Sequence, residues 1–238
     1  MRKNLFFIFL LFAISYEAQA QQGSIADTAT YLDSIKKELK TVWPHNRTIN
    51  LVFHGHSVVA GYQDKHEVHT FESYPYLLLK KLKALYPYAV INVIVTAKGG
   101  ENSYQGQQRF EHDVLIHQPD VLFIDYALND VGIGLAKSRE SWEKMIQEAL
   151  REKIKVILVT PSPDQRINIL APGNKLSQHA AQIRSLAMQY HVGLSDPFSK
   201  FQEIARKEGD IKSYMSHVNH PNREGNEIIA EELVKWFE

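Results

Sequence analysis

The order of apolar and polar positions divides the chain into short strands and amphipathic segments. Five runs are almost wholly apolar, only five to seven residues long, and bounded by polar or turn-forming residues. Such runs are typical of strands in a parallel sheet that is covered on both faces. The predicted strands cover residues 49–53, 89–95, 120–126, 155–160 and 192–196.

The segments between these strands predict helices, because their apolar residues recur every three to four positions. In the first of them, Ile25, Leu32, Ile35 and Leu39 fall roughly on one face. The predicted helices cover residues 24–41, 71–86, about 105–117, 142–153, 174–191 and 222–237. Alternating strands and helices predict an α/β fold, a three-layer α/β/α domain around a central, mostly parallel five-stranded sheet.

The N-terminus has a different pattern. Arg2 and Lys3 precede an apolar run from Leu5 to about Tyr16, and small residues follow up to Ala20. This order is that of a secretory signal peptide, and the run is shorter than the roughly 20 residues that span a bilayer. We expect residues 1–20 to be a signal peptide cleaved near Ala20 and residues 21–238 to form one domain. The protein is then secreted or periplasmic, without stable membrane association; a membrane anchor is the less favoured alternative.

The composition of the chain limits which partners, nucleophiles and metal sites are possible. The 27 basic and 27 acidic residues balance, which argues against a nucleic-acid partner. There is no cysteine, so thiolate metal sites and cysteine nucleophiles are excluded. His54, His56, His66 and His69 lack the helical spacing of a metal site, and we expect neither a metal nor another cofactor.

Polar residues follow the predicted strands at the edge where a parallel sheet binds its ligands. Ser57 follows the first strand, Gly99 and Gly100 the second, and Asn129 the third, while His220 precedes the last helix. Taken singly, each is more often a loop start, a turn or a helix cap. Together at one edge they favour a site for acyl transfer, in which serine is the nucleophile and histidine the base.

Four blocks carrying these residues resemble those of the SGNH (GDSL) hydrolases. The blocks are "GHS" at 55–57, "GGENS" at 99–103, "ALND" at 127–130 and "HVNHPNREG" at 217–225. The resemblance implies the flavodoxin-like SGNH hydrolase fold and an ester hydrolase with Ser57 as nucleophile and His220 as base. It also implies an oxyanion hole formed by the N–H groups of Ser57 and Gly100 and the side-chain amide of Asn129.

Two positions depart from this resemblance. His56 stands where the family has the aspartate before the serine, and His217 stands where it has the triad aspartate. The second departure is the more serious, because the acid of a triad orients the imidazole and stabilises the imidazolium. Neutralising that acid in a serine protease lowers turnover by about 10⁴.

Three groups could orient the base instead. We expect a backbone carbonyl near residues 215–218 to accept the Nδ1 proton of His220. A carboxylate from elsewhere at the same edge, such as Asp164 or Asp130, is one alternative, and His217 itself as the orienter of the base is another.

Export and the resemblance together suggest an acetyl ester on a carbohydrate, either a small molecule or a polysaccharide. Candidates for stacking on sugar rings are Tyr62, Tyr104, Phe110 and Tyr126, and candidates for binding a uronic acid carboxylate are Arg109 and Lys98. The alternatives are a lipid-directed esterase (lysophospholipase or thioesterase), a non-catalytic carbohydrate-binding relative, and an O-acetyltransferase.

Overall fold

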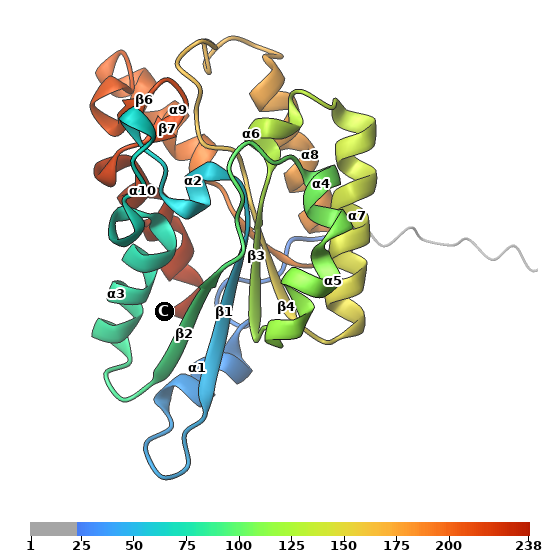
Figure 1. Ribbon diagram of the computed structural model, residues 1–238, viewed down its shortest axis with the longest axis vertical. Coiled ribbons are helices and arrows are strands. Elements are labelled where there is room, and N and C mark those ends of the chain that lie inside the picture. The colour runs from blue at the N-terminus through green and yellow to red at the C-terminus, as the bar shows by residue number, and fades with distance from the viewer. Residues whose placement is uncertain (1–22) are drawn as a thin grey trace, which may run out of the picture.

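In a computed structural model that describes residues 23–238, a five-stranded sheet lies between two layers of helices (Figure 1). The strands are β1 (Thr48–Gly55), β2 (Val90–Val95), β3 (Val121–Asp125), β4 (Lys155–Val159) and β5 (Gly193–Ser195). Their order across the sheet is β2-β1-β3-β4-β5, and every neighbouring pair is parallel. The predicted α/β class is confirmed, and the sheet is wholly rather than mostly parallel.

Helices cover both faces of the sheet. The longer helices are α1 (Asp33–Lys40), α3 (Tyr74–Leu85), α7 (Leu135–Arg151), α8 (Lys175–Tyr190), α9 (Pro197–Glu208) and α10 (Arg223–Val234). The shorter ones are α2 (Ser57–Ala60), α4 (Ser103–Gln108), α5 (Phe110–Asp113) and α6 (Ala127–Asp130). Single 3₁₀ turns are η1 (Asp64–His66), η2 (Thr70–Glu72), η3 (Leu115–His117), η4 (Lys212–Tyr214) and η5 (Lys235–Phe237). A separate two-stranded antiparallel sheet consists of β6 (Met215–His217) and β7 (His220–Pro221).

Two hydrophobic cores explain why the strands are continuously apolar. One core joins the sheet to α1, α3, α9 and α10, and the other joins it to α5, α7 and α8. All five residues of β3 are buried, and Phe53 of β1 stacks on Phe123 of β3 with ring centroids 4.2 Å apart. A strand that is buried on both faces has no polar face, so its sequence does not alternate.

Four helical regions differ from the prediction. The helix predicted over 142–153 begins earlier, at Leu135 of α7, and ends at Arg151. The helix predicted over 24–41 begins only at Asp33, because Asp27 forms a turn in which its carboxylate accepts a hydrogen bond from Ala29 N. The helix predicted over 105–117 is divided into α4, α5 and η3. Helix α9 was not predicted, although Asp196 at its N-cap and Pro197 at its first position form a start signal.

The predicted signal peptide lies outside the described residues. In the part of the chain that the structure describes, no helix has both the length and the apolar character needed to cross a membrane.

Candidate active site

Ser57 lies at the carboxyl end of the central part of the sheet. Strand β1 ends at Gly55, and Ser57 is the first residue of the short helix α2. His56 caps this helix, since its Nδ1 accepts a hydrogen bond from Val58 N at 3.3 Å. The N–H groups in the first turn of a helix have no partner within the helix, so the N–H of Ser57 is positioned to donate to a ligand.

His220 is in direct contact with Ser57, although 163 positions separate them in the chain. Its Nε2 lies 2.8 Å from Ser57 Oγ. Burial, with smaller contributions from the nearby rings of His56 and His217, which oppose a second positive charge, lowers the pKa of His220 to about 4. The imidazole is therefore neutral near pH 7 and able to accept the serine proton, as a general base must.

The other ring nitrogen of His220 has no hydrogen-bond partner among residues 23–238. The backbone carbonyls beside it are engaged elsewhere: His217 O accepts from Gln165 Nε2 at 3.1 Å, and Val218 O accepts from Gln165 N at 2.8 Å. The ring of His217 lies with its centroid 6.1 Å from that of His220, and no hydrogen bond joins the two rings. The carbonyl expected to accept from Nδ1 does not do so in this structure, and His217 lies close to His220 without a hydrogen bond to it.

The two carboxylates considered as alternatives are also occupied. Asp130 accepts hydrogen bonds from Ser103 N at 2.8 Å and from Trp142 Nε1 at 2.7 Å. Asp164 forms an ion pair with Arg166, whose Nε donates to it at 2.9 Å. Nδ1 of the base therefore faces no acid in the described structure.

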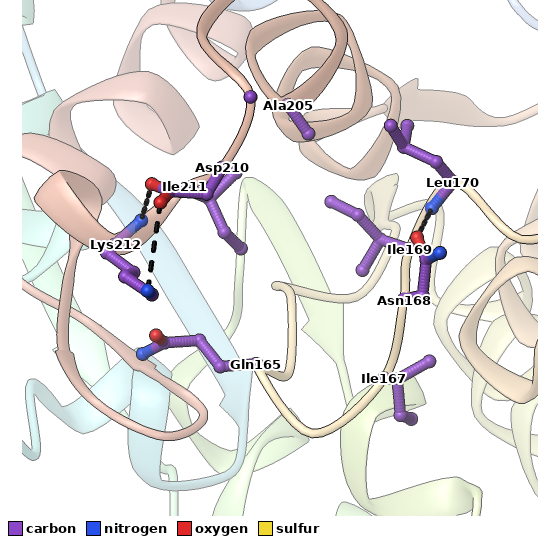
Figure 2. Close-up of a pocket in the computed structure, with 10 residues that line it drawn as sticks. Gln165, Ile167, Asn168, Ile169, Leu170, Ala205, Asp210, Ile211 and Lys212 are labelled. Atoms are coloured by element: carbon purple, nitrogen blue, oxygen red, sulfur yellow. Dashed lines mark hydrogen bonds and ion pairs between the residues drawn. The ribbon is translucent and has the colours of Figure 1, made fainter.

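Gln165, which holds the segment before His220, also lines a cavity of about 170 Å³ (Figure 2). Figure 2 shows Ile167 in the same loop as Gln165. On the facing segment, which follows α9, the backbone N–H of Lys212 donates a hydrogen bond to the side chain of Asp210. Neither Ser57 nor His220 lines this cavity. It is therefore separate from the Ser57–His220 contact, and Gln165 both lines the cavity and bonds the segment before His220.

The loop after β2 supplies Gly100. This residue has φ +76°, and a Cβ built on it would meet no atom within 4 Å. Space alone would admit a side chain there, so it is the left-handed backbone that requires glycine. The turn is closed by Glu101 N, which donates to Lys98 O at 3.3 Å.

Asn129 lies in α6, directly after β3, and is joined to the same loop. Its Nδ2 donates to the backbone oxygen of Glu101 at 2.8 Å, which leaves the second N–H of the amide for another acceptor. Because β1 lies between β2 and β3, the segments that carry Gly100 and Asn129 flank Ser57. The residues expected to form the oxyanion hole therefore come from three adjacent strand ends.

A buried polar cluster behind this loop was not predicted from the sequence. Arg109 Nε donates to both carboxylate oxygens of Glu101, at 2.8 and 3.0 Å, and Tyr126 OH donates to the same carboxylate at 3.0 Å. Tyr126 and Phe110 are buried, so neither is available to stack on a sugar. Arg109 is likewise engaged by Glu101 and Asp113 and is not a free partner for a uronic acid.

The spaced histidines have separate surroundings. His54 Nε2 lies 3.1 Å from Tyr126 OH, while His56 Nε2 lies 3.4 Å from Asp125 Oδ1. His69 is paired with two glutamates of its own loop. Within residues 23–238, no group of three His, Cys, Asp or Glu side chains is placed to hold a metal ion.

The family is decided by a sequence comparison. The model of the GDSL-like lipase/acylhydrolase family matches residues 53–228, which include Ser57, Gly100, Asn129 and His220. The chain belongs to this family. No curated protein matches the chain.

Solved structures of esterases share the fold of this family member. An acetyl xylan esterase is 25% identical over 78% of this chain and 98% of its own, with a TM-score of 0.64. An acetylxylan esterase from Geobacillus stearothermophilus is 20% identical, with 79% and 94% coverage and a TM-score of 0.69. A two-domain esterase active on acetylated mannans is 20% identical with a TM-score of 0.71, and the match covers 87% of this chain but 52% of that one. The chain thus spans about half the length of the two-domain esterase.

Proposed function

We propose that this member of the GDSL-like family is an exported serine esterase that removes acetyl groups from carbohydrates. The observation that carries the proposal is the 2.8 Å contact between His220 Nε2 and Ser57 Oγ at the carboxyl edge of the sheet. A neutral histidine in hydrogen-bond contact with a serine hydroxyl is the arrangement that nucleophilic acyl transfer needs.

The proposed reaction uses the side chains already in place. Ser57 Oγ attacks the acyl carbonyl while His220 Nε2 takes its proton, and the same proton then passes to the leaving sugar hydroxyl. The N–H groups of Ser57 and Gly100 and the free N–H of the Asn129 amide receive the developing oxyanion. A water molecule, deprotonated by His220, then attacks the acetyl carbon; the bond to Ser57 Oγ breaks, acetate leaves, and His220 returns the proton to Ser57 Oγ.

We further propose that the site works as a Ser–His dyad. In the alignment suggested by the four sequence blocks, His56 and His217 stand where related enzymes carry aspartates. The unpartnered Nδ1 of His220 supports the dyad hypothesis. The geometry of the base then depends on the backbone of β6 and β7 and on the hydrogen bonds that Gln165 makes to His217 O, at the end of β6, and to Val218 O.

An acetylated carbohydrate is the substrate class favoured by two observations. The similar solved structures are esterases of acetylated xylan and mannan. Near the proposed oxyanion loop, Tyr104 is 42% exposed, although Lys137 Nζ lies over its ring at 3.5 Å from the centroid, and the ring of Tyr62 lies 3.5 Å from where a side chain on Gly99 would begin. Aromatic rings at such positions offer apolar faces to sugars. Lipid-directed hydrolysis and carbohydrate binding without turnover are the alternative outcomes of the tests below.

Export is proposed from the sequence of residues 1–20. The test is the N-terminal sequence of the protein recovered from the periplasm or medium of a bacterial host. A mature chain beginning near Gln21 supports export, and an intact N-terminus in the cytoplasm contradicts it.

The decisive experiment compares Ser57→Ala with Ser162→Ala. Ser162 is a buried serine that follows β4 at the same edge of the sheet, so it is a matched control. The purified mature protein is expected to hydrolyse p-nitrophenyl acetate and to release acetate from acetylated xylan or mannan. We expect Ser57→Ala to abolish both activities and Ser162→Ala to retain them. Activity retained in Ser57→Ala would refute the nucleophile.

Acyl-chain length separates the two enzyme alternatives. A series of p-nitrophenyl esters from acetyl to decanoyl is expected to give the highest kcat/KM at acetyl. A maximum at long chains would favour a lipid substrate. Binding of acetylated oligosaccharides without release of acetate would favour the non-catalytic alternative.

A further inference from the structure

Glu101 is a buried acidic residue directly after Gly100. Its side chain is 10% exposed, and it has a guanidinium and a phenol as partners. Arg109 binds both carboxylate oxygens through Nε and binds Oε2 again through Nη2. A bidentate pair of this kind is strong and fixes direction as well as distance.

The carboxylate is fixed from a second side by Tyr126. Its hydroxyl donates to Glu101 Oε2 at 3.0 Å and lies 3.1 Å from Nε2 of the buried His54. Thr96 Oγ1 lies 2.8 Å from the other ring nitrogen of His54, so both nitrogens have partners. Tyr126 itself packs tightly, since a Cβ on Gly106 would lie 2.4 Å from its hydroxyl.

The backbone of Glu101 is held as firmly as its side chain. Its N–H donates to Lys98 O, and its oxygen accepts from Asn129 Nδ2. One residue is therefore linked to two of the proposed oxyanion donors: it directly follows Gly100 in the chain, and its backbone oxygen accepts from the amide of Asn129. Burying a carboxylate beside an oxyanion hole opposes the negative charge that develops there, and Arg109 offsets that charge.

We propose that Glu101 is the positioning residue of the oxyanion hole. Its carboxylate, clamped by Arg109 and Tyr126, sets the direction of the Gly100 N–H and of the Asn129 amide. This inference rests on the proposed function, because it assigns no new chemistry to Glu101 and acts only through those two donors. A displacement of about 1 Å in such a group lowers turnover by up to 10²-fold.

The test is Glu101→Gln, with Asp113→Asn as the matched control. Both substitutions remove one carboxylate from Arg109, but Asp113 makes no contact with Gly100 or Asn129 and is half-exposed. For p-nitrophenyl acetate we expect Glu101→Gln to lower kcat by about 10- to 100-fold with KM changed less than about twofold. Asp113→Asn is expected to keep kcat within about twofold.

If Glu101 acted only through its negative charge, Glu101→Gln would change kcat in the opposite direction. Removing a negative charge beside the oxyanion would raise kcat, whereas loss of positioning lowers it. Inhibition by a boronic acid, whose tetrahedral adduct occupies the oxyanion hole, should weaken by the same factor as kcat. The pH at which activity is lost in acid should not move, because it reports His220.

Two further measurements keep the test decisive. Tyr126→Phe keeps the negative charge of Glu101 and removes one hydrogen-bond donor to it, so it should also lower kcat, but by a smaller factor than Glu101→Gln. This variant tests the proposal even if Glu101→Gln does not fold. The NMR signals of the Gly100 N–H and the Asn129 side-chain amide do not depend on turnover. They should shift and exchange faster in Glu101→Gln but not in Asp113→Asn.

The outcomes separate the two proposals. If Ser57→Ala is inactive and Glu101→Gln behaves as Asp113→Asn does, the positioning role is overturned while the esterase stands. If Ser57→Ala retains activity, the assignment of Ser57 as nucleophile fails. In that case the NMR signals still decide the matter: unchanged Gly100 and Asn129 signals in Glu101→Gln overturn the structural role of Glu101 as well.

Discussion

The two sides of Ser57 are built very differently. On the oxyanion side, a buried glutamate is clamped by Arg109 and Tyr126, and its backbone oxygen holds the amide of Asn129. On the base side, His220 makes one side-chain hydrogen bond, to Ser57, and its Nδ1 has no partner among the described residues. The segment that carries it is a pair of strands of three and two residues.

This difference indicates which side of Ser57 contributes more to the rate of the proposed enzyme. A triad stabilises the imidazolium with an acid, and in its absence the oxyanion donors and the position of the substrate account for a larger share of catalysis. We therefore expect substitutions on the oxyanion side to be severe and substitutions at the missing acid position to be mild. Four predictions test this contrast.

The largest effect is expected from Asn129→Ala. The change removes an oxyanion donor and at the same time releases the backbone oxygen of Glu101, so kcat for p-nitrophenyl acetate should fall by about 10²–10³. Asn92→Ala is a suitable control, because Asn92 also donates through Nδ2 but does so to Asn50 on the neighbouring strand. Thermal denaturation of both variants checks that they are folded. A loss of less than tenfold in Asn129→Ala would contradict the proposed oxyanion hole.

The second effect concerns the acid limb of the rate profile. Because burial lowers the pKa of His220 to about 4, log(kcat/KM) should stay nearly level from pH 7 to pH 5 and fall only near pH 4. A histidine with the ordinary pKa of about 6.5 would be only about 1% neutral at pH 4.5, and the rate would fall about 100-fold. An acid limb above pH 6 would show that an unseen acid raises the pKa of the base.

This profile needs a check of folding at each pH. Burial lowers the pKa values of His54, His179 and His220 in the folded state. The unfolded chain therefore takes up protons first as the pH falls through about 6.5, and the stability that these groups contribute above that pH is lost toward pH 4. Rates should be compared only where the tryptophan fluorescence is that of the native protein.

The third effect is a gain. His217→Asp places a carboxylate where the sequence blocks suggest that related enzymes have one, beside the unpartnered Nδ1. An opposite charge within about 4–6 Å raises a histidine pKa by roughly one to three units, so the acid limb should move up by that amount. Orientation of the imidazole should also raise kcat, by about tenfold, which is far below the 10⁴ seen in an evolved triad. His217→Asn, with no charge, should do neither.

The sequence predicts best those features that depend on residues close together in the chain. Buried strands are continuous apolar runs, so the parallel sheet could be predicted. The pairing of Ser57 with His220, which lies 163 positions later, was predicted only from the resemblance of the four sequence blocks. The cluster around Glu101 could not be predicted, because Glu101, Arg109 and Tyr126 come from three segments and meet only through packing. Arg109 and Tyr126 were therefore expected at the substrate, whereas they support the loop from behind.

The orientation of His220 is also beyond sequence reasoning. A carbonyl near residues 215–218 is the acceptor that the sequence predicts, yet whether one points at Nδ1 depends on the backbone geometry of β6 and β7. Gln165, in a loop about 50 positions earlier, donates hydrogen bonds to two of those carbonyls. No local sequence pattern predicts that contact.

The smallest effect is expected from His217→Ala. His217 is exposed, its ring makes no hydrogen bond to His220, and its charge opposes protonation of the base only weakly. We expect kcat/KM for p-nitrophenyl acetate at pH 7 to stay within about twofold, with a slight rise in the pH of the acid limb, because one opposing cation is removed. His45→Ala, at an exposed histidine in the turn before β1, is the control for nonspecific effects. A loss of tenfold or more in His217→Ala alone would mean that His217 orients the base during turnover, and the contrast between the two sides of Ser57 would then be smaller than the structure indicates.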